Sequence, residues 1–118
     1  MLTDECASDG GQVIIKSPLR APDHEQRKAV RQLDTEITIL SGPLKNTEGI
    51  RQLVDQVVLT EGLDRHSQVG VFEHLEFDFH KYYIAQKNGL SRLQIKSMAR
   101  QILTALSNTH KQNIVHTG

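Results

Sequence analysis

The stretch LDTEITIL at residues 33–40 decides how the chain is expected to fold. Apolar residues recur here at the spacing of a single helix face: Leu33, Ile37 and Leu40 within the stretch, and Val30 just before it. Glu36 lies at the edge of that face, where a carboxylate either reaches solvent or needs a cationic partner, because an unpaired buried charge is costly. The pattern predicts an amphipathic helix that begins near Asp23 and ends at Gly42-Pro43.

Short β-branched runs on both sides of this helix predict strands. One run, VIIK at residues 13–16, precedes the helix, and two runs at 53–59 and 69–72 follow it, with a turn at 62–67 between them. We therefore expect the α+β class, with a small antiparallel sheet and one helix packed on it. Residues 1–11 begin polar and without period, and the sequence predicts that they are disordered.

Two further helices are expected in the C-terminal part of the chain. Asp78 is a suitable N-cap for a short helix that contains Phe79, Tyr82 and Tyr83. Ser91 and Gln94 form an S-x-x-Q capping box before a second helix, whose apolar residues keep helical spacing as far as Leu106. The two helices together predict a hairpin-like unit, followed by a short extended segment at 114–118.

Composition narrows the classes of function. The 118 residues contain 14 Lys and Arg against 14 Asp and Glu, so no electrostatic case exists for binding nucleic acid or an anionic membrane surface. No stretch approaches the roughly 18 apolar residues of a membrane span, and no signal-peptide pattern opens the chain. Cys6, the single cysteine, indicates a reducing intracellular compartment, cytoplasmic or nuclear. The six histidines lack metal-ligand spacing, so no metal site is expected.

Lys16 and Glu36 are the first candidate pair for chemistry. A lysine at a strand end and a glutamate at a helix edge are each most often solvated. Taken together, they predict an ion pair that could hold a lysine toward a phosphate. The stretch VFEHL at 71–75, followed by Asp78, has a structural interpretation as a strand end and a helix cap.

These pieces, in this order and at these spacings, resemble the protein kinase domain, and most closely the cyclin-dependent and related serine/threonine kinases. VIIK at 13–16 looks like the V-A-I-K strand, which places Lys16 at the phosphate-binding lysine. Glu36 looks like the C-helix glutamate that pairs with this lysine. The resemblance also implies contacts with the nucleotide. Phe72 falls at the gatekeeper position, and Glu73 and Leu75 fall in the hinge, whose backbone binds adenine. Asp78 matches a position that often reaches the ribose.

The same resemblance implies a domain organisation, and the sequence also departs from the family pattern at several positions. Residues 12–75 would be a partial small lobe with the hinge, and residues 76–118 the start of the large lobe, including the E-helix. No G-x-G-x-x-G precedes Lys16, and His116-Thr117-Gly118 stand where the family has H-R-D, so a glycine replaces the catalytic aspartate. The asparagine and aspartate that hold magnesium have no counterpart. We therefore expect weak ATP binding, no Mg²⁺ held by this chain alone, and no phosphoryl transfer from it.

Three hypotheses remain open at this point. The chain is a serine/threonine kinase-family protein without activity, a noncatalytic pseudokinase-like protein that binds a kinase or its partner, or one piece of a longer active enzyme. The Lys16 strand is expected to be an exposed sheet edge, and the E-helix to expose apolar residues. Both features favour a protein partner or self-association.

Overall fold

The structure is a computed structural model that describes residues 2–6, 11–18, 23–58 and 68–116. It divides into two compact units, the first comprising Met1–Lys45 with Arg51–His74 and the second Asn46–Ile50 with Leu75–Gly118. The described residues form helices and one antiparallel sheet, so the expected α+β class is confirmed. The turn expected at 62–67 and the residues 117–118 lie outside the described residues.

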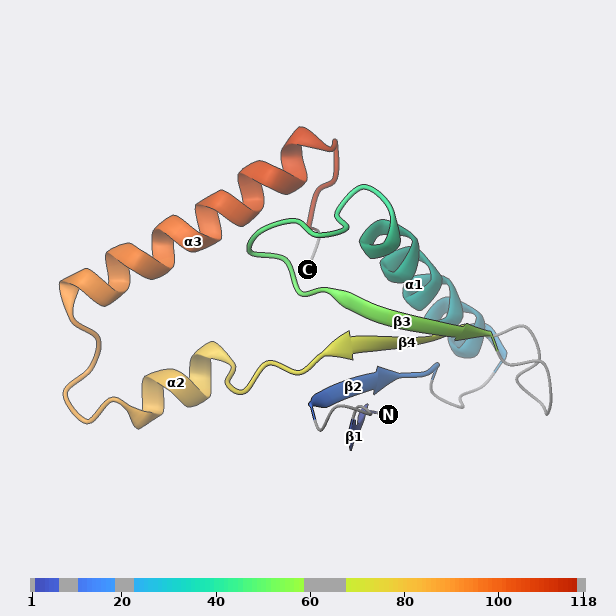
Figure 1. Cartoon of the computed structure of the whole chain (residues 1–118), viewed down its shortest axis with the longest axis horizontal. Helices are drawn as coiled ribbons and strands as arrows, with labels where there is room; N and C mark the ends of the chain where they lie inside the picture. Colours follow the sequence, from blue (N-terminus) through green and yellow to red (C-terminus); the bar gives the residue numbers. More distant parts are fainter. Residues whose placement is uncertain (1, 7–10, 19–22, 59–67, 117–118) are drawn as a thin grey trace. The chain divides into compact units, whose positions relative to one another are not determined.

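The first unit contains a sheet whose described strands follow the order β1-β2-β4-β3, each antiparallel to its neighbours (Figure 1). Three of them are the strands that the sequence predicts: β2 (Gln12–Lys16), β3 (Leu53–Val58) and β4 (Gln68–Glu73). Between β2 and β4, Lys16 is opposite Gly70 and Ile14 is opposite Phe72. Because opposed residues share a face of a sheet, Lys16 and Phe72 project to the same side.

The strand β1 (Leu2–Cys6) corrects two expectations. The sequence predicts disorder over 1–11, whereas Leu2–Cys6 pair with β2, from Leu2 opposite Lys16 to Cys6 opposite Gln12. Residues 1 and 7–10 of that range lie outside the described residues. Pairing with an adjacent strand supplies backbone hydrogen bonds that a polar segment cannot reveal in its own pattern. β2 consequently lies between β1 and β4, so the Lys16 strand is not the exposed sheet edge that the sequence predicts.

Helix α1 (Asp23–Ser41) packs against β3 and β4 and builds the core of the first unit (Figure 1). The apolar face predicted from the sequence is the face that packs on the sheet. The buried apolar residues of the described chain are all in this unit: Leu33, Ile37, Leu40, Leu44 and Phe72. Burial of each such side chain contributes about 1.5–3 kcal/mol relative to exposure, so this cluster is what holds α1 on the sheet.

Gly70 in β4 is required by the packing of Phe72. A Cβ at Gly70 would lie 2.6 Å from Cε2 of the Phe72 ring and 3.4 Å from Cδ1 of Ile37. The missing side chain leaves the space in which the ring is fully buried, at 0% exposure. A glycine that weakens the strand pattern in the sequence therefore makes the core possible.

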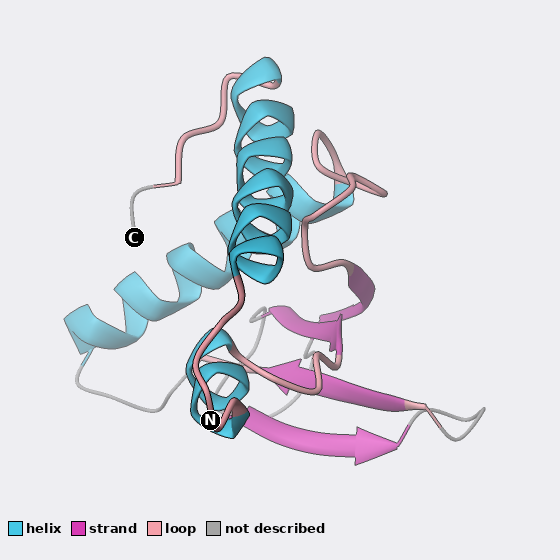
Figure 2. Ribbon diagram, turned by 90° about the vertical axis from the view of Figure 1, so that its left-hand side faces the viewer, coloured by secondary structure: helices cyan, strands magenta, loops and turns pink. Residues whose placement is uncertain are grey.

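The second unit contains α2 (Phe79–Ala85) and α3 (Arg92–Lys111), drawn as cyan helices in Figure 2. The predicted N-cap of α2 is confirmed, because Lys81 N donates to Asp78 Oδ1 at 2.7 Å. The predicted capping box of α3 is also confirmed: Gln94 N donates to Ser91 Oγ at 3.2 Å, and Ser91 N donates to Gln94 Oε1 at 2.8 Å. Both helix starts therefore follow from local sequence.

Side-chain hydrogen bonds join α3 to other parts of the second unit. Gln94 Nε2 donates to Tyr82 Oη at 3.1 Å and so links α3 to α2. Asn108 Nδ2 donates to the carbonyl of Glu48 at 3.3 Å and links α3 to the segment Asn46–Ile50. Only Thr109 is buried among the described residues of this unit. None of the helices in the described ranges combines the length and the apolar character that crossing a bilayer requires.

Candidate functional site

Lys16 and Glu36 form the ion pair that the sequence predicts. Lys16 Nζ lies 2.6 Å from Glu36 Oε1, and joins the last residue of β2 to the middle of α1. Their side chains are 28% and 39% exposed, so the pair is partly open to solvent. The ammonium is therefore fixed in direction by a carboxylate and still reachable by a second anion.

Phe72 lies beside this pair. Lys16 Nζ is 4.6 Å from the centroid of the Phe72 ring, within the range of a cation–π contact. The ring is fully buried in the core, so it provides a rigid surface below the ammonium. Three of the predicted site residues, Lys16, Glu36 and Phe72, are thus brought together by β2, α1 and β4.

Glu73, at the end of β4, has its backbone already bonded. Glu73 N donates to the carbonyl of Gln52 at 3.1 Å, and Gln52 N donates to Glu73 Oε1 at 2.8 Å. The carbonyl of Glu73 accepts from Arg51 Nε at 2.9 Å. The backbone group to which the resemblance assigns adenine binding therefore already has a cationic donor beside it.

Arg51 is the site residue that the sequence did not reveal. Its Cζ lies 5.5 Å from the centroid of the Phe72 ring, so the guanidinium contacts both Phe72 and the Glu73 carbonyl. In the sequence Arg51 is one basic residue ahead of an apolar run, which is an ordinary strand flank. Only the antiparallel pairing of β3 with β4 brings it to Glu73.

Leu75 and Asp78, the other two residues predicted to contact a nucleotide, belong to the second unit. They line a hollow together with Phe79, Met98 and Ile102. Leu75 is 56% exposed, and Asp78 Oδ1 serves as the N-cap acceptor of α2. Their contacts with a nucleotide stay predictions.

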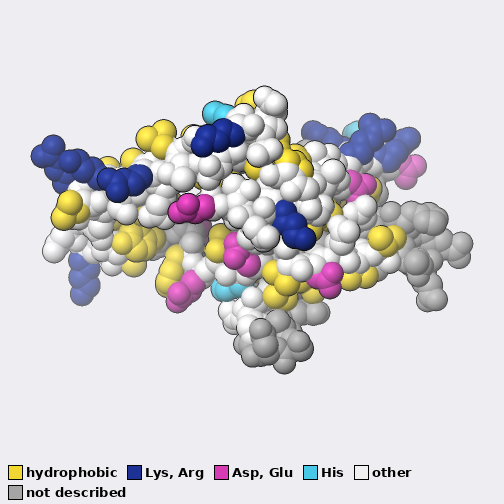
Figure 3. Space-filling model, turned by 45° about the horizontal axis from the view of Figure 1, so that its top comes forward, with side chains coloured by type: hydrophobic (Ala, Val, Ile, Leu, Met, Phe, Trp, Pro, Cys, Tyr) yellow, Lys and Arg dark blue, Asp and Glu magenta, His cyan; other side chains and the backbone are white. Residues whose placement is uncertain are grey.

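A second candidate surface runs along α3. One side carries an exposed apolar stripe: Ile95, Ala99, Ile102, Leu103 and Leu106. Next to it lies a basic row with i, i+4, i+8 spacing: Arg92, Lys96 and Arg100. The helix contains no Asp or Glu. Figure 3 shows basic and apolar side chains next to one another over this helix.

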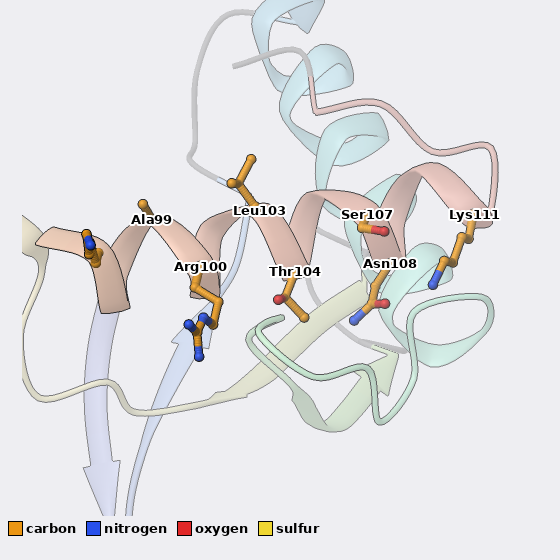
Figure 4. A pocket seen from close by; sticks show the side chains of 8 residues that line it. Ala99, Arg100, Leu103, Thr104, Ser107, Asn108 and Lys111 are labelled. Atoms are coloured by element: carbon orange, nitrogen blue, oxygen red, sulfur yellow. The ribbon is translucent and has the colours of Figure 1, made fainter. Parts of the chain in front are cut away.

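A shallow pocket lies against the basic side of α3 (Figure 4). In this view Arg100, Thr104 and Asn108 follow one another along one edge of the helix, whereas Ala99 and Leu103 project from its other edge. This surface can offer hydrogen-bond donors and apolar contact to the same partner. In the part of the chain that the structure describes, no group of three or more His, Cys, Asp or Glu side chains could hold a metal ion.

Comparison with models of known protein families finds no family that matches the chain, and comparison with curated proteins finds no sequence that matches it.

Proposed function

We propose that the chain is a serine/threonine protein-kinase-type domain fragment whose first unit binds the phosphates of a purine nucleotide, with ATP as the expected ligand. The observation that carries the proposal is the ion pair of Lys16 with Glu36 above the buried ring of Phe72. A lysine oriented by a carboxylate is the arrangement by which kinases hold the α- and β-phosphates. Cys6 as the single cysteine fits an intracellular setting, cytoplasmic or nuclear.

The proposed roles follow the geometry of the pair. Lys16 Nζ binds a phosphate oxygen, and Glu36 is a positioning residue that holds the ammonium through the ion pair between β2 and α1. Glu73 would meet the purine through its backbone, although its carbonyl already accepts from Arg51. Weak binding is expected, because Lys16 is the main phosphate ligand.

Phosphoryl transfer is not part of the proposed function. His116-Thr117-Gly118 offer no carboxylate where kinases accept the substrate proton, and no other residue of these 118 matches the magnesium ligands. With radiolabelled ATP and generic protein acceptors, we expect no transfer above background. Transfer that Lys16→Met abolishes would contradict this expectation.

Calorimetric titration of the full chain with ATP, with and without Mg²⁺, tests nucleotide binding. We expect weak binding that changes little with Mg²⁺ and weakens about tenfold in Lys16→Met, since a hydrogen bond to a charged group is worth about 1.5–3 kcal/mol. Lys45→Met removes an exposed lysine of the same unit and is the matched control. Equal affinity in the wild type and in Lys16→Met would refute the role of Lys16, and tight Mg²⁺-dependent binding would refute the proposed mode.

A noncatalytic interaction protein is the second candidate, and the surface of α3 favours it. The exposed apolar stripe beside a basic row matches a partner helix with apolar residues and a row of Asp or Glu. α3 has no acidic residue, so two copies of it would bring only like charges together. It also has no aromatic residue, and its basic row borders one side of the stripe, which differs from helices that lie on membranes.

Reversing the charges of the peptide and of the basic row on α3 tests this second candidate. The comparison of two peptides on the wild-type chain does not depend on how any variant folds. We expect an amphipathic Leu/Glu peptide to bind the full chain better than its Leu/Lys counterpart. The triple variant Arg92→Glu, Lys96→Glu, Arg100→Glu should prefer the Leu/Lys peptide instead. An unchanged preference, binding to phosphatidylserine vesicles but to neither peptide, or a dimer that blocks the peptide would each refute an acidic helical partner.

A further inference from the structure

Arg51 alters the hydrogen-bonding character of the proposed purine site. Its Nε donates to the Glu73 carbonyl at 2.9 Å, and its Cζ lies 5.5 Å from the Phe72 centroid. Both neighbours are rigid, since Phe72 is fully buried and Glu73 ends the central strand β4. The guanidinium is therefore held in advance of any ligand, and a ligand does not have to order it.

An adenine base meets this arrangement unfavourably. The 6-amino group of adenine is a donor, and at the Glu73 carbonyl it would have to share the acceptor with Arg51, which already donates there. On the remaining lone pair of this carbonyl, the amino group would lie next to a cationic donor, which repels it. The N–H of Glu73 offers no compensation, because it donates to the Gln52 carbonyl.

A 6-oxopurine meets the same arrangement favourably. Guanine and hypoxanthine carry acceptors at O6 and N7, and arginine binds this pair of atoms in a bidentate manner. Besides Nε, the guanidinium has donors on Nη1 and Nη2 that can supply such a pair. We propose that the site prefers 6-oxopurine nucleotides, of the guanosine or inosine class, over adenine nucleotides. This inference rests on the proposed function, because it concerns the base of the nucleotide whose phosphate Lys16 binds.

The shape of the guanidinium, and not its charge alone, sets this preference. Lysine at position 51 would keep the positive charge but lacks the planar fork that matches two acceptors. Arg51→Lys therefore separates base recognition from general attraction of the nucleotide. Arg31→Ala removes an exposed arginine from α1 in the same unit and provides the matched control.

Titration of the full chain with ITP and with ATP, in separate experiments, tests the inference. These nucleotides differ at position 6 and in the protonation of the adjacent N1, and they keep the same ribose and phosphates. In the wild type we expect ITP to bind about tenfold more tightly than ATP, since one good bidentate contact gives about 1–3 kcal/mol of discrimination. In Arg51→Ala the ratio should fall to one or reverse, because the ITP affinity drops and the ATP affinity rises. Arg51→Lys should lose most of the preference, and Arg31→Ala should keep it.

The outcomes distinguish this inference from the proposed function. ATP binding that is equal to or tighter than ITP binding in the wild type overturns the 6-oxopurine preference and leaves nucleotide binding standing. The same ITP/ATP ratio in the wild type and in Arg51→Ala also overturns it. No binding of either nucleotide overturns the proposed function, and the base preference with it. The wild-type comparison needs no variant, so it does not depend on how Arg51→Ala folds.

Discussion

Helices α1 and α3 are nearly equal in length, at 19 and 20 residues, and both have an apolar face in sequence, yet they bury that face very differently. Ile37 of α1 is 2% exposed, whereas Ile102 of α3 is 61% exposed. The difference lies in the neighbours: α1 packs on β3 and β4, whereas Thr109 is the buried residue of α3 within its unit. An amphipathic pattern thus specifies which face can be buried, but the partner decides whether it is.

One alanine substitution in each helix tests this difference in burial. Ile37→Ala should lower the free energy of unfolding by about 2–5 kcal/mol, because it removes a buried side chain and leaves a cavity. Ile102→Ala, the same change at an exposed position, should alter it by less than about 0.5 kcal/mol. Urea denaturation followed by circular dichroism measures both values. Similar losses in the two variants would mean that α3 is packed as tightly as α1.

Gly70→Ala tests whether Gly70 leaves the space that the Phe72 ring occupies in the core of the first unit. The added Cβ would meet the Phe72 ring at 2.6 Å, so we expect a loss of about 1–3 kcal/mol from overpacking. The double variant Gly70→Ala, Phe72→Leu should be more stable than the sum of its single changes predicts, because leucine lacks the ring atoms that clash. Strict additivity in denaturation experiments would show that Gly70 does not make room for Phe72.

Asp34 is a weak point within the well-packed unit. Its Oδ1 is buried and finds no hydrogen-bond partner among the described residues. Asp34→Ala should therefore raise the free energy of unfolding by about 1 kcal/mol, through relief of an unsatisfied polar atom. Gln32→Ala, at an exposed position of α1, reports the gain from helix propensity alone. A destabilised Asp34→Ala would show that the carboxylate has a partner in solution.

The ion pair should have the smallest effect on stability. Because Lys16 and Glu36 are both partly exposed, we expect Glu36→Gln to cost about 0.2–1 kcal/mol. Thermal unfolding at low and high salt checks this, since screening should reduce the difference between wild type and variant. A loss of several kcal/mol would mean that the pair is a structural element of the core and would weaken its assignment to a ligand.

The features that the sequence predicts are those set by local pattern. The caps Asp78 and Ser91 depend on residues three positions away, and the faces of α1 and α3 depend on helical period. The ion pair of Lys16 with Glu36 could be predicted because Lys16 ends an apolar strand and Glu36 lies at the edge of the apolar face of its helix. The nucleotide roles of Leu75 and Asp78 have no comparable local signal and stay predictions from resemblance.

The features that the sequence does not predict depend on which strands pair. β1 gains its order from β2, and Arg51 reaches Glu73 only through the pairing of β3 with β4. Gly70 looks unfavourable in its strand until Phe72 is placed over it. Such features depend on contacts between residues distant in sequence, which no period or motif encodes.

Thermal unfolding of the full chain with and without ATP tests the central claim, which is that Lys16, oriented by Glu36, binds a nucleotide phosphate. A ligand of the folded state at ten times its dissociation constant adds about 1.4 kcal/mol. We therefore predict that ATP raises the Tm of the wild type by roughly 5 °C and raises that of Lys16→Met much less, whereas adenosine has little effect on either. An equal ATP shift in both proteins, or no shift in the wild type at saturating ATP, would contradict the claim.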